Sequence, residues 1–366
     1  MIYKLKDICI RITDGSHFSP KAKTNGYPMF SVKDMLTYGF DYSNCKRICK
    51  EDFEKMLKSG CVPQAGDVLV AKDGSYLKEI FVCTETKKEA VLSSIAIFRP
   101  NQKIVNSYFL CYLLKSPNIY NYISSNCVSG SALPRIILKA FKEIEVDIPD
   151  LHVQENIVRI LKLLDDKIAL NTRINRNLSE QLKVIFSKMF PTIADNGSNT
   201  LEEIISFSNG KKRPDTEGKV PVYGGNGILS YTDKSNAENC VIIGRVGAYC
   251  GSLYLSIEPC WISDNAIKAE AKNSKSQMFI YYLLQELALS NRHIGTSQPL
   301  LTQGILNAIP FTCPSEEGII SFCKKANDIQ KLIDMNTIEN KRLSELRDTL
   351  LPKLMSGELD VSDLNI

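Results

Sequence analysis

Two long stretches of the chain carry apolar side chains at steps that alternate between four and three residues. In the first stretch these positions are Ile157, Leu161, Leu164, Ile168, Asn171, Asn175, Leu178, Leu182, Ile185 and Met189. In the second they are Phe322, Ala326, Ile329, Ile333, Asn336, Asn340, Leu343, Arg347, Leu350 and Leu354. This heptad spacing predicts two long helices, each with an apolar seam. At a rise of 1.5 Å per residue, each predicted helix is about 50 Å long.

The two predicted helices are copies of one another. Residues 167–180 and 332–345 are identical at seven of fourteen positions without a gap, at an offset of 165 (336 − 171). The same offset relates Pro134 to Pro299, and residues 108–114 match a later segment at an offset of 170. An internal repeat on this scale indicates two structurally similar halves, although the front part of each half has diverged.

In both seams, two consecutive seam positions are occupied by asparagine. Buried asparagines reduce apolar burial but fix the register and the partner of a helix. We expect the two helices to pair with each other, because each exposes an apolar stripe that must be covered. The alternative is a solvated turn that faces outward at the asparagines. The residues expected to pair are Leu164, Ile168, Asn171, Asn175, Leu178, Leu182, Ile329, Ile333, Asn336, Asn340, Leu343 and Leu350.

The front part of each half carries short apolar runs, such as residues 66–71 and 240–244, separated by clusters of Gly, Asn, Asp and Pro. This pattern predicts mixed domains with substantial strand content. The fold class is therefore α+β, with two strand-rich mixed domains that are each followed by a long helix. The predicted division is a first domain at 1–150, a helix at 151–191, a polar linker at 192–200, a second domain at 201–315, and a helix with a C-terminal tail at 316–366.

Composition adds little to this picture. Of the 366 residues, 45 are Lys or Arg and 41 are Asp or Glu, so the net charge of +4 does not by itself indicate a nucleic-acid partner. Residues 1–150 hold 21 basic and 16 acidic residues, whereas residues 200–315 hold ten of each.

The chain is long and its start is charged too early for a signal peptide, so we expect its twelve cysteines to be reduced. No apolar run approaches the roughly 20 residues of a membrane span, and we expect a cytoplasmic protein.

The sequence contains no recognisable catalytic motif. His17, His152 and His293 lack the spacing of metal ligands, and no phosphate-binding loop occurs. The glycines of residues 244–251 do not have dinucleotide-binding spacing, and those of residues 224–227 are typical of a hairpin. The Asn/Asp-Pro-Pro-aromatic loop of amino-methyltransferases is also absent. We therefore expect a protein that is not an enzyme and has no cofactor of its own.

Several segments together resemble the specificity (S) subunits of type I restriction-modification systems. The first domain has Thr13-Asp-Gly-Ser-His17, and the second has Val220-Pro-Val-Tyr-Gly-Gly-Asn-Gly-Ile228. The remaining similar segments are residues 31–35 and 66–74 in the first domain, 243–251 in the second, and the helix ends 186–190 and 351–359. Each motif alone is moderately specific. In this order, over two domains and two helices, they cover essentially the whole chain.

The resemblance implies a function and a set of partners. Each domain would be a target recognition domain that reads one half of an asymmetric, bipartite site in double-stranded DNA. The two helices would pair as an antiparallel coiled coil with pseudo-twofold symmetry, separate the two readers and dock two methyltransferase (M) subunits. The M subunits would bind S-adenosylmethionine and methylate adenine N6, while restriction (R) subunits would use ATP and Mg to cleave DNA. The even charge of the second domain further implies weak DNA binding without these partners.

Two other interpretations remain open at this point. A coiled-coil scaffold or adaptor would keep the architecture but would not bind DNA sequence-specifically. A fused restriction enzyme or an independent methyltransferase would need a cofactor motif. The sequence predicts neither the target bases nor the spacer length, because a base code requires the orientation of every loop.

For base contacts we expect loops that carry bidentate donors or amides beside glycines. In the first domain these residues are Ser16, His17, Lys21, Lys23, Lys72, Asp73, Ser75, Tyr76, Ser129, Ser131 and Arg135. In the second they are Lys211, Lys212, Arg213, Tyr223, Asn226, Arg245, Tyr249, Arg292, Thr296, Ser297 and Gln298. Each basic residue could instead be a solvated charge or a phosphate contact, and Tyr223 and Tyr249 could instead pack within the sheets.

Overall fold

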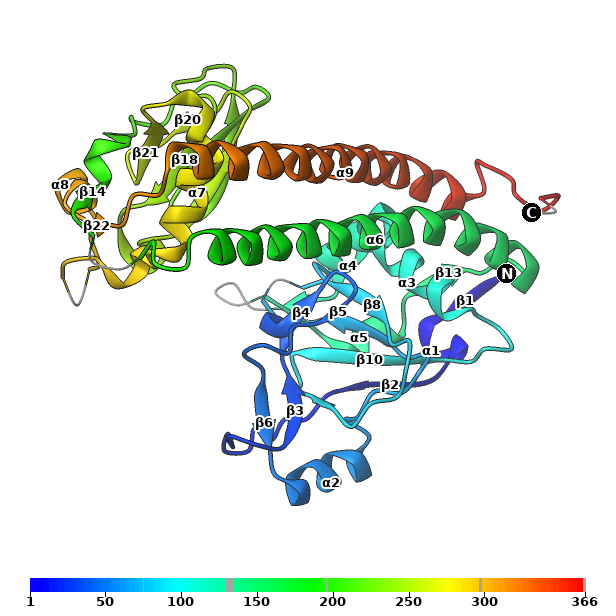
Figure 1. The fold of residues 1–366 in the computed structure, drawn as a ribbon. Helices are drawn as coiled ribbons and strands as arrows, with labels where there is room; N and C mark the ends of the chain where they lie inside the picture. Colours follow the sequence, from blue (N-terminus) through cyan, green and yellow to red (C-terminus); the bar gives the residue numbers. More distant parts are fainter. Residues whose placement is uncertain (75, 130–133, 195–196, 296–297, 365–366) are drawn as a thin grey trace. The chain divides into compact units, whose positions relative to one another are not determined.

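The computed structural model describes residues 1–74, 76–129, 134–194, 197–295 and 298–364. The chain forms two compact units. Unit 1 consists of Met1–Asn171 and Ile338–Ile366, and unit 2 consists of Thr172–Thr337. Each unit contains a strand-rich domain and a part of both long helices, α6 (Leu151–Met189) and α9 (Glu316–Ser356) (Figure 1). The two long helices are confirmed, but the boundaries between the compact units lie inside them and not at the linker.

The main sheet of unit 1 is antiparallel, with the strand order β2, β10, β7, β8. Its strands are β2 (Cys9–Asp14), β7 (Val68–Ala71), β8 (Ile80–Val82) and β10 (Ile95–Pro100). All residues of β7 are buried, which explains why this strand is an uninterrupted apolar run. A second sheet has the order β6, β3, β9, and its strands are β3 (Tyr27–Phe30), β6 (Lys46–Ile48) and β9 (Ala90–Val91).

Helices and short strands complete unit 1. The helices are α1 (Leu5–Ile8), α2 (Lys50–Ser59), α3 (Ser107–Lys115), α4 (Pro117–Asn126) and α5 (Leu138–Lys142). The short strand pairs are β1 (Ile2–Lys4) with β13 (Glu145–Asp147), β4 (Met35–Leu36) with β5 (Gly39–Phe40), and β11 (Val128–Ser129) with β12 (Arg135–Ile136). Helix α3 begins after Asn106, whose side chain accepts hydrogen bonds from the backbone N–H groups of Tyr108 and Phe109. The main core joins the sheet and α3 to the helix residues Leu161 and Leu351.

Unit 2 repeats this arrangement. Its main antiparallel sheet has the order β15, β21, β18, β19, and its strands are β15 (Ile205–Asn209), β18 (Cys240–Gly244), β19 (Leu253–Ser256) and β21 (Ala266–Ala271). The second sheet has the order β17, β16, β20, and its strands are β16 (Val220–Gly224), β17 (Gly227–Thr232) and β20 (Trp261–Ile262). The remaining elements are α7 (Gln277–Glu286), α8 (Gln303–Asn307) and the strand pair of β14 (Asn199–Thr200) with β22 (Pro310–Phe311).

The two units therefore share one sheet topology, including the fronts that diverge in sequence. Helix α3 packs against β7 and β8, and its counterpart α7 packs against β18 and β19. The match between residues 108–114 and 278–284 is thus a structural equivalence. In both second sheets the middle strand has one parallel neighbour, β9 beside β3 and β20 beside β16. Differences in loop length and side chains obscure this repeat in the sequence.

Two smaller expectations have mixed outcomes. The hairpin expected at residues 224–227 is confirmed, because β16 and β17 pair through Gly224 and Gly227. The segment predicted as a linker is packed at both ends, since Ile193 is buried in the core of unit 2 and Asn199–Thr200 form β14.

The structure describes all twelve cysteines as free thiols. Among the described residues, no helix has the length and apolar character needed to span a membrane.

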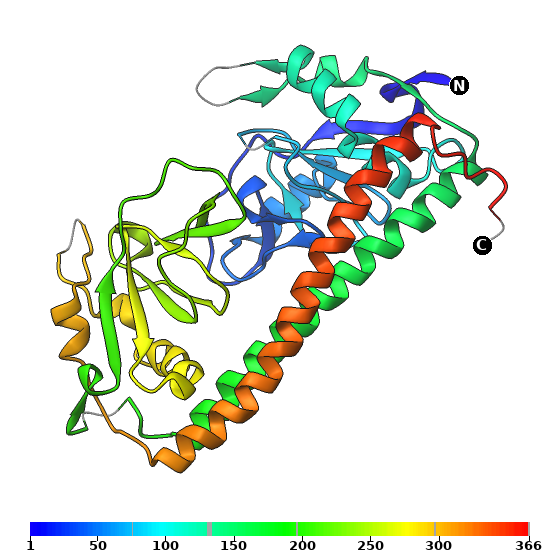
Figure 2. The ribbon, with the colours of Figure 1, turned by 90° about the horizontal axis from the view of Figure 1, so that it is seen from above.

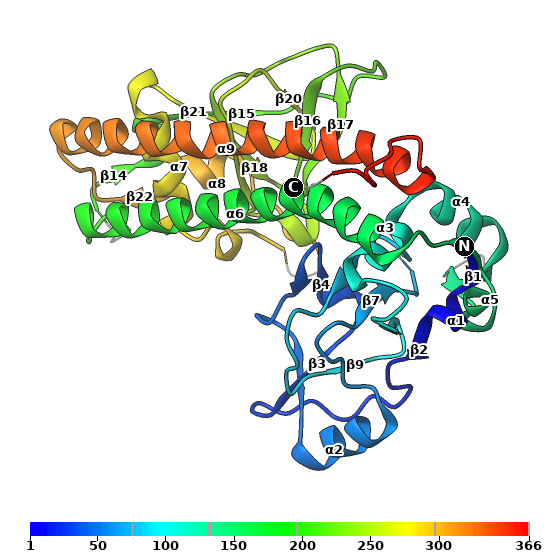
Figure 3. The ribbon, with the colours of Figure 1, turned by 90° about the vertical axis from the view of Figure 1, so that its right-hand side faces the viewer.

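Within each unit, the parts of α6 and α9 that belong to it lie side by side (Figure 2, Figure 3). In unit 1 the Asn171 amide donates to Asn340 Oδ1 at 3.0 Å and to Glu339 at 2.7 Å. In unit 2 the Asn336 amide donates to Asn175 Oδ1 at 2.8 Å. Asn171 is buried and Asn175 is half-buried, so neither asparagine lies on an outward-facing, solvated turn. The other residues expected to pair are buried or half-buried as well.

Candidate nucleic-acid interface

In unit 1, three backbone segments meet at one end of the main sheet. Gly15 and Ser16 follow β2, and their N–H groups donate to the carbonyl oxygens of Ile95 and Val91. After β7, the Gly74 N–H donates to the Pro134 carbonyl at 2.8 Å, and the Ile136 N–H donates to the Lys72 carbonyl at 3.0 Å. The segments that carry Ser16, Asp73 and Arg135 are therefore held together by main-chain hydrogen bonds.

A charged cluster occupies this end of the sheet. Lys72 Nζ lies 3.3 Å from Asp14 Oδ2 and 3.5 Å from Asp73 Oδ1, and the Lys72 side chain is only 7% exposed. Arg135 Nε lies 3.3 Å from the same Asp73 oxygen, and the Arg135 side chain is 57% exposed. His17 Nε2 lies 3.5 Å from Asp14 Oδ2 and is exposed. The carboxylates and Lys72 thus form a mostly buried layer beneath two exposed basic groups.

The exposed basic residues of unit 1 continue along the following loop. Lys21 and Lys23 are exposed, and the Lys23 N–H donates to the Arg47 carbonyl at 2.9 Å. Lys46 Nζ donates to Ser19 Oγ at 2.8 Å, which places the first residues of β6 beside this loop. We did not expect Lys46 or Arg47 from the sequence, although the dibasic pair was a visible signal. Together these side chains form a basic surface suited to phosphate contacts.

Unit 2 brings the equivalent segments together in the same way. The N–H groups of Gly210 and Lys211 donate to the carbonyl oxygens of Ala266 and Ile262. The Gly247 N–H donates to the Pro299 carbonyl at 3.0 Å, which is the counterpart of the bond between Gly74 and Pro134. This agreement supports the alignment of Pro134 with Pro299 across the two units.

The β16–β17 hairpin joins this end of unit 2. Ser252 Oγ donates to the Gly225 carbonyl at 2.5 Å, and a Cβ on Gly244 would come within 2.3 Å of the Tyr249 carbonyl oxygen. Glycine at position 244 therefore permits the close approach of the hairpin and the Tyr249 turn. Exposed Asn226 lies at the hairpin tip, and Tyr249 is half exposed.

Arg245 differs from its counterpart Lys72 in its surroundings. By register, the positions of Asp14 and Asp73 correspond to Asn209 and Val246, so both carboxylates are missing. Arg245 Nε is buried and has no hydrogen-bond partner among the described residues. A buried donor without a partner is uncommon in folded proteins.

The remaining predicted contact residues vary in their exposure. Lys211, Lys212, Arg213, Arg292, Gln298 and Ser129 are exposed, whereas Ser16 is buried with its hydroxyl bonded to the Phe18 carbonyl. Tyr76 packs against the main core of unit 1, and Tyr223 packs near Tyr254 with a ring-centroid distance of 6.2 Å. Burial raises the pKa of Tyr223. Ser75, Ser131, Thr296 and Ser297 lie outside the described residues.

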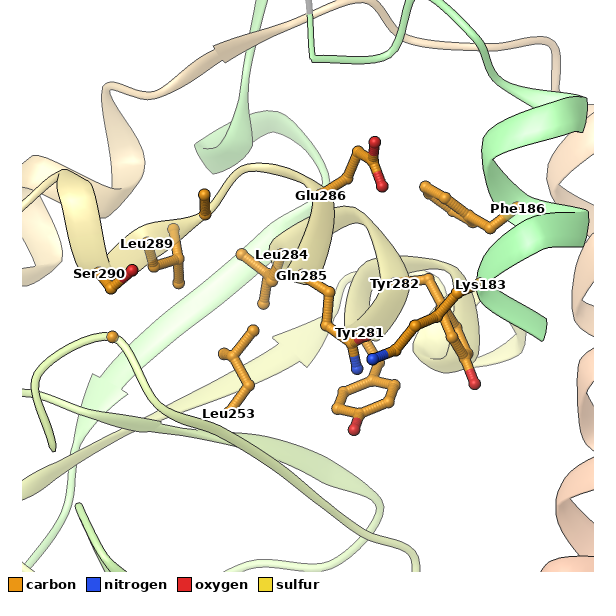
Figure 4. Close-up of a pocket in the computed structure, with 12 residues that line it drawn as sticks. Lys183, Phe186, Leu253, Tyr281, Tyr282, Leu284, Gln285, Glu286, Leu289 and Ser290 are labelled. Atoms are coloured by element: carbon orange, nitrogen blue, oxygen red, sulfur yellow. The ribbon is translucent and has the colours of Figure 1, made fainter. Parts of the chain in front are cut away.

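A cavity of about 570 Å³ lies elsewhere in unit 2, between α6, α7 and β19 (Figure 4). Its lining includes Lys183, Tyr281, Tyr282 and Glu286. None of the predicted base-contact residues lines this cavity. Among the described residues, no group of three or more His, Cys, Asp or Glu side chains is arranged to hold a metal ion.

Two domains of one sheet topology, each with basic side chains beside glycine-containing turns at the same end of its main sheet, define a class of protein with two similar binding domains. The family model of the type I restriction modification DNA specificity domain matches residues 1–180 and 195–347. The chain therefore belongs to the family of type I restriction modification DNA specificity proteins. It is a DNA sequence-specificity subunit, which in this family is non-catalytic.

Individual relatives agree with this assignment. The chain is 25% identical to the type I restriction enzyme HindI specificity subunit of Haemophilus influenzae, with 98% of this chain and 99% of the relative covered. It is 22% identical to the type I restriction enzyme MjaVIII specificity subunit of Methanocaldococcus jannaschii, with 86% and 84% covered. The crystal structure of the type I restriction-modification system S subunit from M. genitalium matches with a TM-score of 0.57 and 19% identity, covering 97% of this chain and 95% of that chain. The structural likeness shows a shared fold.

Proposed function

We propose that each of the two domains reads one half of an asymmetric, bipartite site in double-stranded DNA. The observation that carries this proposal is the shared end of the two main sheets, where the bonds from Gly74 to Pro134 and from Gly247 to Pro299 recur. The scaffold is the same, whereas the side chains on it differ. A common scaffold with different donors suits two readers of different half-sites.

We further propose that α6 and α9 pair as an antiparallel coiled coil. The contacts run in opposite order along the two helices, because Asp165 contacts Arg347 and Asn171 contacts Asn340. The asparagine contacts are also reciprocal. Asn171 donates to Asn340 in unit 1, and its repeat counterpart Asn336 donates to Asn175 in unit 2. Reciprocal contacts between equivalent positions are the signature of twofold pairing.

The length of the helices supports a role in setting the spacing of the half-sites. The helices have 39 and 41 residues, which corresponds to about 60 Å at a rise of 1.5 Å per residue. One turn of B-DNA spans about 34–36 Å. Helices of this length are sufficient to separate two readers by a turn of DNA or more.

The outer faces of the helices support docking of two M subunits. In unit 1, Leu163, Leu170 and Ile338 are exposed, and in unit 2, Leu332 and Met335 are exposed. Leu170 and Met335 are repeat counterparts, so each unit exposes an apolar side chain at this equivalent position. Apolar surface of this kind marks protein interaction sites. In this proposal S-adenosylmethionine, ATP and Mg bind to the M and R subunits, and the complex acts in the cytoplasm.

The proposal is tested by single-molecule sequencing of genomic DNA from cells that express this chain with the M subunit encoded beside it. We expect one split motif that carries N6-methyladenine on both strands and that disappears without this chain. Arg245→Ala should weaken methylation through one half-site, whereas Lys103→Ala, at an exposed loop position, should not. Co-purification of the two proteins without any methylated motif would contradict DNA reading and favour a scaffold.

A further inference from the structure

The charged cluster of unit 1 and its counterpart in unit 2 have the same backbone but different side chains. The backbone bridge between Asp73 and Arg135 corresponds to the bridge between Val246 and Leu300. Unit 2 therefore forms this structure without any charge at either position. The fold therefore does not require the ion pair between Asp73 and Arg135, and a role in binding would explain its presence.

The cluster is costly to bury, and two of its members, Arg135 and His17, are exposed. Side-chain exposure is 7% for Lys72, 17% for Asp14 and 13% for Asp73. Desolvating three charges is unfavourable unless they pair closely, and a well-packed apolar core would serve stability equally well. Of the two exposed members, Arg135 is the one that the carboxylate of Asp73 contacts, at Nε.

The contact at Nε leaves the terminal Nη1 and Nη2 groups of Arg135 available. Among the described residues, Asp73 is the only ionic partner of this guanidinium. The coplanar terminal N–H groups of a guanidinium match the O6 and N7 acceptors of guanine in the major groove. Asp73 restricts the rotation of the guanidinium before DNA arrives, which lowers the entropy cost of binding.

We infer that Arg135 reads a guanine in the half-site of the first domain and that Asp73 is its positioning residue. The inference rests on the proposed function and adds the base that one residue recognises. Lys72 contacts the carboxylates of both Asp73 and Asp14 from the buried side. The second domain reads its half-site without an equivalent arginine, since Leu300 occupies that position.

The test measures methylation rates of the complete complex of this chain with its M subunits. The substrates are duplexes in which each base pair of the first half-site is replaced in turn by the other three. We expect the wild-type complex to prefer G at one position by about tenfold to a hundredfold. Arg135→Gln should reduce that preference to within about threefold and leave all other positions unchanged.

Further variants separate positioning from folding. Asp73→Asn should weaken the preference at the same base pair only, and Arg135→Lys should retain an intermediate preference there. Lys103→Gln removes one exposed positive charge elsewhere in unit 1 and should change nothing. Thermal melting and co-purification with the M subunit show whether each variant is folded.

Three results would overturn the inference. The first is an equal loss of methylation rate on all duplexes with Arg135→Gln, which would indicate a phosphate contact. The second is that Arg135→Gln relaxes the preference at a base pair where the wild-type complex does not prefer guanine. The third is that Arg135→Gln leaves the preference for guanine unchanged. Failure of the proposed function itself is distinct, because the wild-type complex would then methylate no split motif at all.

Discussion

Units 1 and 2 attach their domains to the long helices by opposite means. In unit 1, Asp165 accepts hydrogen bonds from Arg347 at 2.8 Å, Tyr38 at 3.0 Å and Tyr112 at 2.8 Å. In unit 2 the counterpart of Arg347 is Leu182, which is fully buried in a core that contains Phe186, Tyr282 and Phe322. One junction is thus a buried polar network, and the other is an aromatic and aliphatic core.

This difference shows that the shared topology does not depend on the chemistry of the junction. Burial alone lowers the pKa of Arg347, but its hydrogen bonds to Asp165 and Asp348 outweigh this effect and raise the pKa. Glu339, on the same helix, has a lowered pKa because Asn171 and Lys167 donate to it. A buried ion pair adds little net stability over an apolar junction, but it strongly penalises a mismatched partner. The polar junction of unit 1 should therefore be sensitive to single substitutions.

The largest effect should come from placing the charge of unit 1 into unit 2. Leu182→Arg buries an unpaired guanidinium among aromatic rings, and we expect a loss of about 5 kcal/mol or more in the unfolding free energy of unit 2. Hydrogen exchange of α7, followed by mass spectrometry in increasing urea, measures this loss. Leu182→Met is the matched control and should cost less than about 1.5 kcal/mol. A stable Leu182→Arg variant would show that the two junctions are interchangeable.

The reverse single substitution should be less severe. Arg347→Leu leaves Asp165 buried without its cation, and we expect the unfolding free energy of unit 1 to fall by about 3 kcal/mol. This is the lower end of the range for a broken buried ion pair, because the Arg347 side chain is 23% exposed. Exchange of α3 amides reports on unit 1. Arg342→Leu, at an exposed position of the same helix, should change stability by no more than about 0.5 kcal/mol. Equal effects of the two substitutions would contradict a special role for the ion pair.

Removing one tyrosine hydroxyl from each junction should reveal a further difference in stability between units 1 and 2. Tyr112→Phe removes a donor to a carboxylate and should cost unit 1 about 1.5–3 kcal/mol. Tyr282→Phe should cost unit 2 little, because Tyr282 lies in an aromatic and aliphatic core and its ring packs edge-on against Phe322. Parallel urea titrations of the two variants make the comparison. A larger loss from Tyr282→Phe would show that the junction of unit 2 is also polar.

Tyr112 should also make the stability of unit 1 depend on pH in the alkaline range. Burial and the nearby Asp165 carboxylate raise the pKa of Tyr112, whereas an unfolded tyrosine has a pKa of about 10. The unfolded state therefore loses its proton first as pH rises above about 10, and this contribution to stability is present below pH 10 and declines above it. Unit 1 of the Tyr112→Phe variant should lose less stability between pH 9 and pH 11 than the wild type. Identical pH slopes would contradict this assignment.

The smallest net effect is expected from converting both partners in unit 1 to the residues of unit 2. Arg347→Leu with Asp165→Gln, the residue at the counterpart position 330, removes both charges, and the double variant should differ from the wild type by no more than about 1 kcal/mol. The double variant is compared with Arg347→Leu alone by the same hydrogen-exchange assay. If the double variant is as unstable as the single one, the lost contacts matter more than the unpaired charge.

Much of the architecture was readable from the sequence. The heptad seams and the identical positions in residues 167–180 and 332–345 predicted both helices and the repeat, because side-chain periodicity follows directly from helix geometry. The aligned Pro134 and Pro299 also indicated two equivalent loops. Lys46 and Arg47 were missed, since only the pairing of β3 and β6 brings them beside the loop with Lys21 and Lys23.

The sequence by itself determined the periodic elements and the family resemblance, since both depend on residues that are close together in the chain. The tertiary structure alone decided which distant charges meet. Asp14, Lys72, Asp73 and Arg135 form one cluster only because three separate segments meet at the same edge of a sheet. Likewise, Asp165 and Arg347 are partners because two helices pass each other in opposite directions, a relation that no local pattern specifies.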